Sequence, residues 1–154
     1  MRTFTDDSGI TDLCSLSQST FLSLNGEQRS VKMWDVRQSE RDSTVKVFQD
    51  MHNDRVNALE RLNQEVFCST SNDGTVNIWN LKMNKLMKNV PVCTSSRVTA
   101  VKFLKQRYML VAHENKLTLM DVINDFKYID TYTPNCEDYS SAYSSDSAKG
   151  IGHG

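Results

Sequence analysis

Two strand-like runs separated by a tight turn stand out in residues 66–81, VFCSTSNDGTVNIWNL. Side chains alternate in the second run, so that Val76 and Ile78 face one way and Trp79 faces the other, as in a β-strand. Between the runs lies Asn72-Asp73-Gly74, and Asp and Gly tolerate the positive φ angles that a tight hairpin turn requires. The pattern therefore predicts a β-hairpin.

The same order of elements occurs three times along the chain. Each copy begins with spaced aliphatic residues and contains a short apolar run, a polar turn and an alternating run. The alternating runs end as VKMWDV at 31–36, VNIWNL at 76–81 and LTLMDV at 117–122. A fourth strand-like run follows each of them, at 45–48, 86–90 and 127–132. The sequence therefore predicts four short strands in every stretch of roughly 40–45 residues, a spacing typical of radially repeated sheets.

Composition and charge are those of an ordinary folded domain. Hydrophobic residues make up 38% and charged residues 24% of the 154 residues, and the net charge is −1. This balance provides no positive field that would attract nucleic acid or an anionic membrane. The N-terminus is polar, and no apolar run approaches the roughly 20 residues that span a bilayer. We therefore expect a cytoplasmic or nuclear protein that binds neither nucleic acid nor membranes.

Residues that commonly carry catalysis or bind metals are scattered. The four cysteines include no CxxC pair, and His52, His113 and His153 share no ligand spacing. His113 is expected in a turn, and the acidic pair Asp6-Asp7 in a loop. No glycine-rich phosphate-binding loop is present. The sequence therefore predicts no enzymatic activity, no metal site and no cofactor.

Several residues match a known repeat family. Trp34-Asp35 and Trp79-Asn80 end the third strands of two repeats, and Met51-His52 stands where the family has Gly-His. In these features the chain resembles the WD-repeat β-propellers. The resemblance implies an all-β fold of three four-stranded antiparallel blades, and the three WD-like repeats would span about 10–50, 51–92 and 93–133.

Three blades do not close a ring, since propellers typically have four to eight. We therefore expect a partial propeller that is open. Three explanations stay open: the chain is a fragment or short form of a longer propeller, it assembles with other copies of itself or with another chain, or its own ends cover the open faces. In residues 1–9, Arg2-Thr3-Phe4 would be the last strand of a neighbouring blade. Residues 134–154 are expected to form a flexible Ser-rich tail, whose serines near Asp146 are candidate phosphate acceptors.

The resemblance also implies an internal hydrogen-bond network that only the second repeat can complete. Its members would be Trp79, a serine hydroxyl from Ser69 or Ser71, the imidazole of His52 and the carboxylate of Asp73. The indole N–H needs an acceptor when it is buried, and a serine hydroxyl would supply one. We expect this network to stabilise the second blade, because a fully satisfied polar network rigidifies its surroundings.

Two arginines are candidates for partner binding. Arg55 and Arg97 each precede the innermost strand of a repeat, and in propellers of this family the loops at that position line a face that binds partners. A planar head group with several donors pairs well with acidic or phosphorylated peptides. The alternative is that both arginines are only solvated charges in loops. The prediction is a protein–protein interaction scaffold that binds partner peptides through loops on one face.

Two other functions stay open. Trp34-Asp35-Val36-Arg37 resembles the WDxR ending by which some WD-repeat proteins dock onto the adaptor of cullin-type ubiquitin ligases, and Arg37 would then mark a substrate receptor. The turn upstream, residues 25–30, lacks the Asp of that motif. The second alternative is a truncated form that competes with a longer propeller for its partners.

Overall fold

The computed structural model describes residues 1–6 and 8–134, which form three four-stranded antiparallel sheets without any helix. The first sheet consists of β1 (Asp12–Ser15), β2 (Thr20–Asn25), β3 (Ser30–Asp35) and β4 (Thr44–Phe48). The second consists of β5 (Val56–Arg61), β6 (Val66–Ser71), β7 (Thr75–Asn80) and β8 (Lys85–Pro91). The third consists of β9 (Val98–Leu104), β10 (Tyr108–His113), β11 (Lys116–Asp121) and β12 (Lys127–Tyr132). The predicted all-β fold is confirmed.

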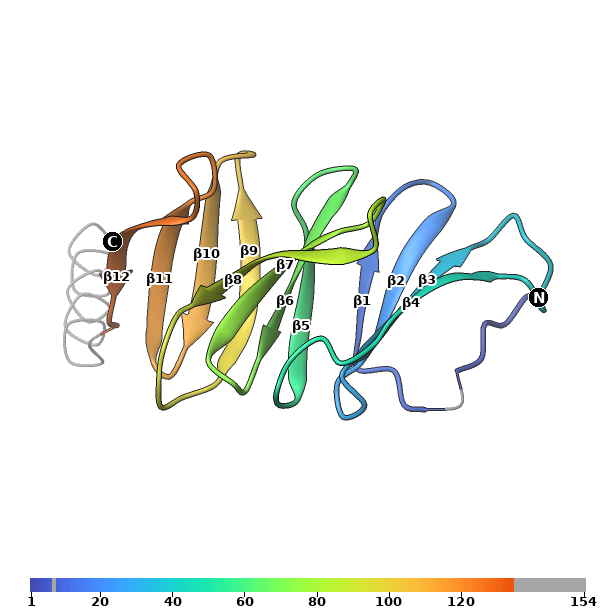
Figure 1. Cartoon of the computed structure of the whole chain (residues 1–154), viewed down its shortest axis with the longest axis horizontal. Helices are drawn as coiled ribbons and strands as arrows, with labels where there is room; N and C mark the ends of the chain where they lie inside the picture. Colours follow the sequence, from blue (N-terminus) through green and yellow to red (C-terminus); the bar gives the residue numbers. More distant parts are fainter. Residues whose placement is uncertain (7, 135–154) are drawn as a thin grey trace, which may run out of the picture.

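The sheets lie side by side and do not close into a ring (Figure 1). Strands follow one another in chain order within each sheet, so that β1, β5 and β9 are the inner strands and β4, β8 and β12 the outer ones. β5 packs against both β1 and β9, whereas the part of the chain that the structure describes shows no such packing of β1 on β9. The first and third sheets therefore each have one face without a neighbouring sheet. This is the open, partial propeller that the repeats predict.

Two apolar clusters hold the sheets together. Leu22, Phe67 and Trp79 belong to the cluster between the first and second sheets, and Ile78 and Met109 to the cluster between the second and third. Successive side chains of a strand point to opposite faces, so β7 sends Trp79 into one cluster and Ile78 into the other. Both faces of the middle sheet are therefore buried, and each large apolar side chain buried there stabilises the fold by roughly 1.5–3 kcal/mol.

The outer strand of every sheet is paired with the same irregularity. The pairing register shifts between Met33 and Trp34 in the first sheet, between Ile78 and Trp79 in the second, and between Leu119 and Met120 in the third. Each shift falls at the same place in the alternating run. Residues of the three sheets can therefore be matched one to one.

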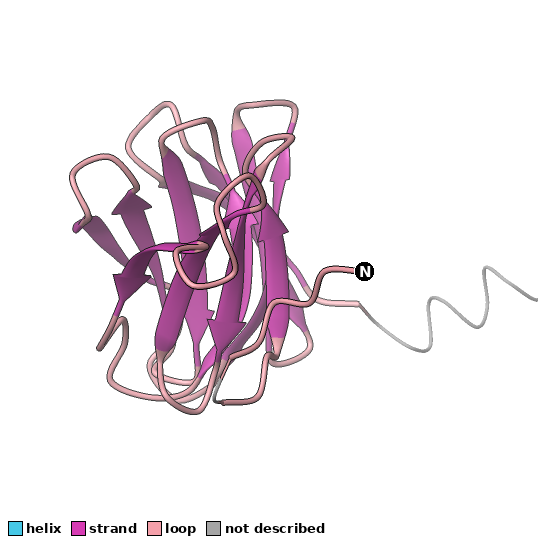
Figure 2. Ribbon diagram, turned by 90° about the vertical axis from the view of Figure 1, so that its right-hand side faces the viewer, coloured by secondary structure: helices cyan, strands magenta, loops and turns pink. Residues whose placement is uncertain are grey.

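The axes of the antiparallel strands are roughly aligned, and their turns gather at two opposite ends of the array (Figure 2). The turn at residues 72–74 is as tight as predicted, but only Gly74 has a positive φ, of 83°. Among the described residues there is no helix long and apolar enough to cross a membrane. Residues 135–154, which hold nearly all of the expected tail and its serines, lie outside the described residues.

One expectation about a single residue was wrong. His113 is not in a turn but is the buried last residue of β10, because a register shift lets that strand continue to pair with Val98. Asp6 lies outside the strands, as expected, but it is buried: its carboxylate accepts a 2.6 Å hydrogen bond from Lys32 of β3, and its side chain is 4% exposed. The N-terminal segment is therefore packed onto the first sheet.

Candidate interaction face

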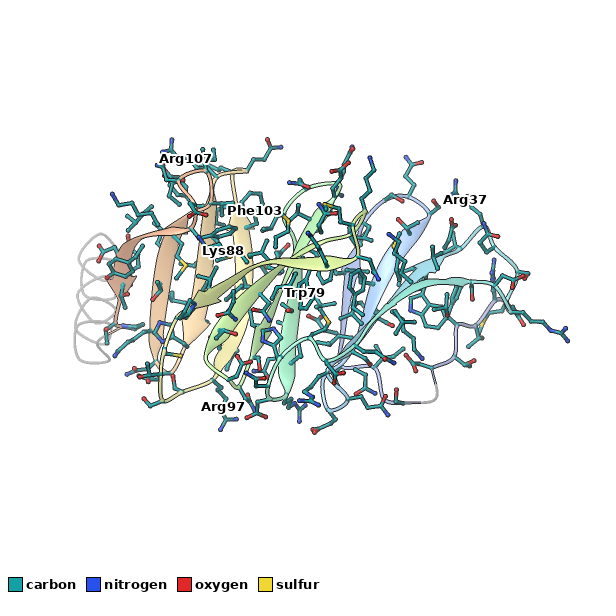
Figure 3. All side chains as sticks on the ribbon, viewed as in Figure 1. Arg37, Trp79, Lys88, Arg97, Phe103 and Arg107 are labelled. Atoms are coloured by element: carbon teal, nitrogen blue, oxygen red, sulfur yellow. The ribbon has the colours of Figure 1, made fainter. Side chains whose placement is uncertain are left out.

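Two loops between sheets and three hairpin turns gather on one side of the array, the lower edge of Figure 1. They are the β4–β5 and β8–β9 loops and the β2–β3, β6–β7 and β10–β11 turns. Arg55 ends the first of these loops and Arg97 ends the second, so we call this side the arginine face. Figure 3 shows Arg97 at this edge and Arg37 at the other edge, which we call the opposite face.

Backbone contacts hold the loops of the arginine face in place. The carbonyl of Gly26 accepts a hydrogen bond from Val56 N (3.1 Å), and the carbonyl of Gly74 accepts hydrogen bonds from Val92 N (3.0 Å) and Cys93 N (3.1 Å). A Cβ added at Gly74 would collide with the carbonyl oxygen of Cys93, and its φ of 83° is one that other residues rarely adopt. Glycine is therefore required there, and the loops are anchored before a partner arrives.

A chain of hydrogen bonds runs through the second sheet and ties the β4–β5 loop to it. Trp79 Nε1 donates to Ser69 Oγ (2.9 Å), and Ser69 Oγ lies 2.7 Å from His52 Nε2. His52 Nδ1 lies 3.0 Å from Asp73 Oδ2. Because a carboxylate only accepts, Nδ1 carries the proton and Nε2 accepts from the serine hydroxyl. The side chain of His52 is 0% exposed, so the middle of the chain is closed to water.

The charge states of the histidine and the carboxylate follow from their surroundings. Burial lowers the pKa of His52, and the nearby carboxylate of Asp73 offsets this lowering only in part. Burial alone would raise the pKa of Asp73, but the hydroxyl of Thr75, the charge of His52 and the N–H of Asn53 together bring it below its usual 3.8. Near neutral pH a neutral imidazole therefore donates to an ionised carboxylate.

The two serines that the sequence left as alternatives have different partners. Ser69 is the one that contacts His52 and Trp79. Ser71 Oγ instead donates to the backbone carbonyl of Arg55, at 2.8 Å. Ser71 thus holds the chain at the point where it enters β5, and both serines help to fix the position of the β4–β5 loop, which ends at Arg55.

The first sheet contains only a part of this network, and the third sheet has a different contact. In the first, Trp34 Nε1 donates to Ser23 Oγ at 2.7 Å. In the third, His113 Nε2 lies 2.7 Å from Thr118 Oγ1, and Met120 replaces the tryptophan. None of the histidines that the structure describes lies in a cluster of His, Cys, Asp or Glu that could hold a metal ion.

Arg55 already has an acidic partner. Its guanidinium donates to the carboxylate of Glu27, which lies in the β2–β3 turn of the neighbouring sheet. The two side chains are 45% and 71% exposed. Exposed ion pairs of this kind contribute only about 0.2–1 kcal/mol. An anion that offers more acceptors can therefore replace Glu27 at Arg55.

Arg97 stands at the matching position before β9, but no ion pair or hydrogen bond of its guanidinium is found within residues 1–6 and 8–134. The acid that matches Glu27 in the next turn is Asp73, and its carboxylate is already used by His52. Arg97 is exposed and lines a polar hollow of about 480 Å³ together with Asn72, Ser95, Ser96 and Glu114. An arginine without an anion therefore lies among hydroxyl and amide donors.

The acidic residue of this hollow, Glu114, already has two partners of its own. The carboxylate of Glu114 lies 3.6 Å from Lys116 Nζ. A hydrogen bond from Ser96 lowers the pKa of Glu114, and the charge of Lys116 lowers it further. Carboxylate and phosphate oxygens accept hydrogen bonds from groups such as Arg97 and the serine hydroxyls. The hollow is therefore suited to one anionic group.

Arg37 lies on the opposite face and is held by a neighbouring residue. Its Nε and Nη2 donate to the two carboxylate oxygens of Asp35, at 3.0 and 2.7 Å. This pairing lowers the pKa of Asp35 to about 2. The side chain of Arg37 is still 70% exposed. The structure therefore brings Arg55 and Arg97 to one face and places Arg37 on the other.

A groove on the opposite face was not foreseen from the sequence. It lies between the second and third sheets, has a volume of about 950 Å³, and is lined by residues that include Leu62, Ile78, Met87, Phe103 and Ile123. Phe103 marks its position in Figure 3. These residues come from segments far apart in the chain, so no local pattern of the sequence indicates the groove.

An array of four-stranded antiparallel sheets with inner strands side by side defines a β-propeller architecture. The family model "WD domain, G-beta repeat" matches residues 43–80. The crystal structure of the WD40 beta propeller domain of Doa1 superposes with a TM-score of 0.72 at 20% identity, covering 84% of this chain and 42% of that chain. Residues 43–80 therefore match a WD repeat, and the fold of the described residues is an open part of a WD40-type propeller.

One curated relative is similar over much of the chain. Telomerase protein component 1 of Rattus norvegicus is 25% identical over 109 residues, which is 70% of this chain and 4% of that protein. The chain thus spans a small part of this relative and less than half of the matched Doa1 domain.

Proposed function

We propose that the arginine face binds an acidic or phosphorylated peptide of a partner protein, with Arg97 as the main contact. The observation that carries this proposal is that Arg97 is exposed and without an anionic partner, while the equivalent Arg55 is neutralised by Glu27. The WD-repeat fold supports a scaffold role in general.

Binding would use the hollow beside the β8–β9 loop. A phosphate or carboxylate of the partner accepts hydrogen bonds from Arg97, and the hydroxyl of Ser95 can donate to one of its remaining oxygens. Arg55 then exchanges Glu27 for a second acidic group of the same peptide. Because Gly74 anchors the backbone at Val92 and Cys93, little ordering of this part of the described loop is needed on binding, which favours affinity.

A titration followed by NMR tests this proposal. The probes are a short Gly/Ala peptide with a single phosphoserine and its unphosphorylated twin. The phosphopeptide is expected to shift amide signals of residues 95–97, Asn72 and Glu114, and Arg97→Ala is expected to abolish these shifts. Arg41→Ala, an exposed arginine of the β3–β4 loop, is the matched control. Shifts that survive in Arg97→Ala, or no shifts in the parent protein, would contradict the proposal.

A second proposal concerns the opposite face. Asp35 orients the guanidinium of Arg37, which is 70% exposed, and this geometry suits recognition of Arg37 by a partner such as a ubiquitin-ligase adaptor. Co-precipitation of the adaptor with the protein, lost in Arg37→Ala and kept in Arg41→Ala, is the expected result. Equal recovery of the adaptor with both variants would count against a substrate-receptor role.

A further inference from the structure

The groove of the opposite face continues the apolar core between the second and third sheets. Its floor includes Leu62 and Ile78, which belong to the buried cluster there, and Phe103, which packs against that cluster. Its rim includes Met87 and Ile123, which are 55% and 69% exposed. Apolar surface therefore extends from the core to the solvent.

The repeat does not require apolar residues at two of these positions. Counted from the register shift in the outer pairing of each sheet, Ile123 stands where the second sheet has Lys82 and the first has Arg37. By the pairing of the inner strands, Phe103 stands where the second sheet has Arg61. Arg61 and Lys82 line the matching hollow between the first and second sheets. The fold therefore accepts cations at both positions, and apolar residues there indicate a binding surface.

The walls of the groove are held in place before a ligand arrives. The β9–β10 and β11–β12 turns, residues 104–107 and 124–127, both contribute to its lining, and a backbone hydrogen bond of 3.1 or 3.2 Å closes each turn. The two central residues of both turns have positive φ angles of 48–60°, as in type I′ turns. Lys88 of β8 ties the second turn to the second sheet, because its Nζ lies 3.0 Å from the carbonyl oxygen of Asp125. Binding therefore requires little ordering of the walls.

One cation of the groove has no anionic partner among the described residues. Arg61, the last residue of β5, donates from Nε to the carbonyl of Asn63 at 3.0 Å, and its guanidinium makes no ion pair there. The other charged residues of the lining, Lys88 and Asp125, neutralise each other at 2.7 Å. The side-chain amide of Gln64 also lines the groove. The groove therefore combines apolar surface with one net positive charge.

We propose that this groove binds a segment of a partner protein in which apolar side chains stand next to an acidic one. The apolar side chains of the segment fill the space between Met87, Phe103 and Ile123 and remove that surface from water. Its carboxylate accepts hydrogen bonds from the Nη groups of Arg61. Charge complementarity with Arg61 selects an acidic segment over a basic one. This site is separate from the hollow at Arg97 and does not depend on it.

The shape of the groove favours a peptide segment over a small molecule. Small-molecule sites bury most of the surface of their ligand. The two rim residues here are more than half exposed, so a small molecule would keep much of its surface in water. A peptide lies across the rim and covers both Met87 and Ile123. The unbranched, flexible side chain of Met87 adapts its shape to the side chain that meets it.

A titration of the full chain followed by methyl and amide NMR tests the proposal. The probes are a short Gly/Ser peptide with Leu-Asp-Leu at its centre and a twin with Leu-Lys-Leu. The acidic peptide is expected to shift the methyl signals of Met87 and Ile123 and the amide signal of Arg61. It is expected to bind at least about fivefold more tightly than the basic twin, because the twin brings a like charge to Arg61.

Variants assign the binding to the apolar rim and to the cation. Ile123→Asp is expected to abolish the shifts, whereas Ile129→Asp, an exposed apolar residue of β12, is the matched control. Arg61→Glu is expected to reverse the preference, so that the basic twin binds more tightly, and Arg41→Glu is expected to leave the preference unchanged. Arg97→Ala is expected to keep the binding, which separates this result from binding at the arginine face.

Several results would overturn the proposal. These are groove signals that do not shift with either peptide, shifts that survive Ile123→Asp, and equal affinities for the two peptides in the parent and in Arg61→Glu. Groove signals that change with protein concentration alone would identify a second copy as the occupant instead. Groove signals that change on deletion of residues 135–154, without any peptide, would identify that segment of the chain itself, and either result would exclude a partner segment as the main occupant.

Discussion

Replacing Asp73 by alanine removes the acceptor at the end of the buried hydrogen-bond chain. The carboxylate accepts from His52 Nδ1 (3.0 Å), from the N–H of Asn53 (3.1 Å) and from both the N–H and the hydroxyl of Thr75 (3.0 and 2.7 Å). The imidazole is closed to water, so its Nδ1–H loses its carboxylate acceptor and keeps only the longer contact to the hydroxyl of Thr75, at 3.2 Å. The other donors lie nearer the surface and can turn to water.

The expected loss of stability follows from these contacts. A buried donor that loses its charged acceptor costs about 1–3 kcal/mol, and the three solvent-accessible hydrogen bonds lose a smaller amount each. We expect a total of about 3 kcal/mol, which corresponds to a fall in Tm of about 6–12 °C for a domain of this size. Thermal unfolding followed by circular dichroism measures it. Glu65→Ala, at an exposed position of the β5–β6 turn, is the matched control and should leave Tm nearly unchanged.

Equal Tm values for Asp73→Ala and Glu65→Ala would refute the reasoning. Water would then replace the hydrogen bonds of this network without a loss of stability. A large effect of Asp73→Ala together with an unchanged Tm of Ser69→Ala would restrict the stabilising part to the His52–Asp73 contact.

Three further predictions follow from burial and backbone geometry. The free energy of unfolding should fall as the pH drops below about 6.5, because burial lowers the pKa of His52 and the unfolded chain takes up a proton that the folded chain does not; urea titrations at several pH values measure this. Phe48→Ala should lower stability by about 3–5 kcal/mol in urea unfolding, and Phe4→Ala by less, because Phe4 belongs to no sheet. Gly74→Ala should lower Tm, since its Cβ meets the carbonyl of Cys93 at a φ of 83°.

Each of these has a result that contradicts it. His52→Gln should be less stable than the parent at pH 7 but lose less stability on acidification, and an unchanged pH dependence would exclude His52 as its source. If Phe4→Ala costs as much as Phe48→Ala, the N-terminal segment is as firmly attached as a strand. A Gly26→Ala variant that is destabilised while Gly74→Ala is not would show that the positive φ has no part in the effect.

The hairpin at residues 66–81 was predictable because its information is local. Turn residues and alternating side chains stand next to each other in the sequence, and recurrence of the pattern extended the prediction to three sheets. The choice between Ser69 and Ser71 was not predictable, since two residues two positions apart in a strand face the same way. Only the position of the imidazole, brought in from another loop, separates them.

The difference between the two arginines was also beyond the sequence. Arg55 and Arg97 stand at matching positions, and each has an acid in the neighbouring turn. Glu27 is free to pair with Arg55, whereas Asp73 is committed to a buried histidine. Two contacts between neighbouring sheets were missed for a similar reason. Lys46 of β4 donates to the carbonyl of Leu81, and Lys88 of β8 donates to the carbonyl of Asp125, so each lysine contacts a distant segment of the chain.

Small-angle X-ray scattering tests most directly the claim that three sheets lie side by side with two outward faces left open. A low protein concentration keeps separate molecules apart. The scattering profile should match an open row of three sheets in which β12 and the first sheet are at opposite ends (Figure 1). A profile of a closed ring, with the third sheet in contact with the first sheet of the same chain, would contradict the account.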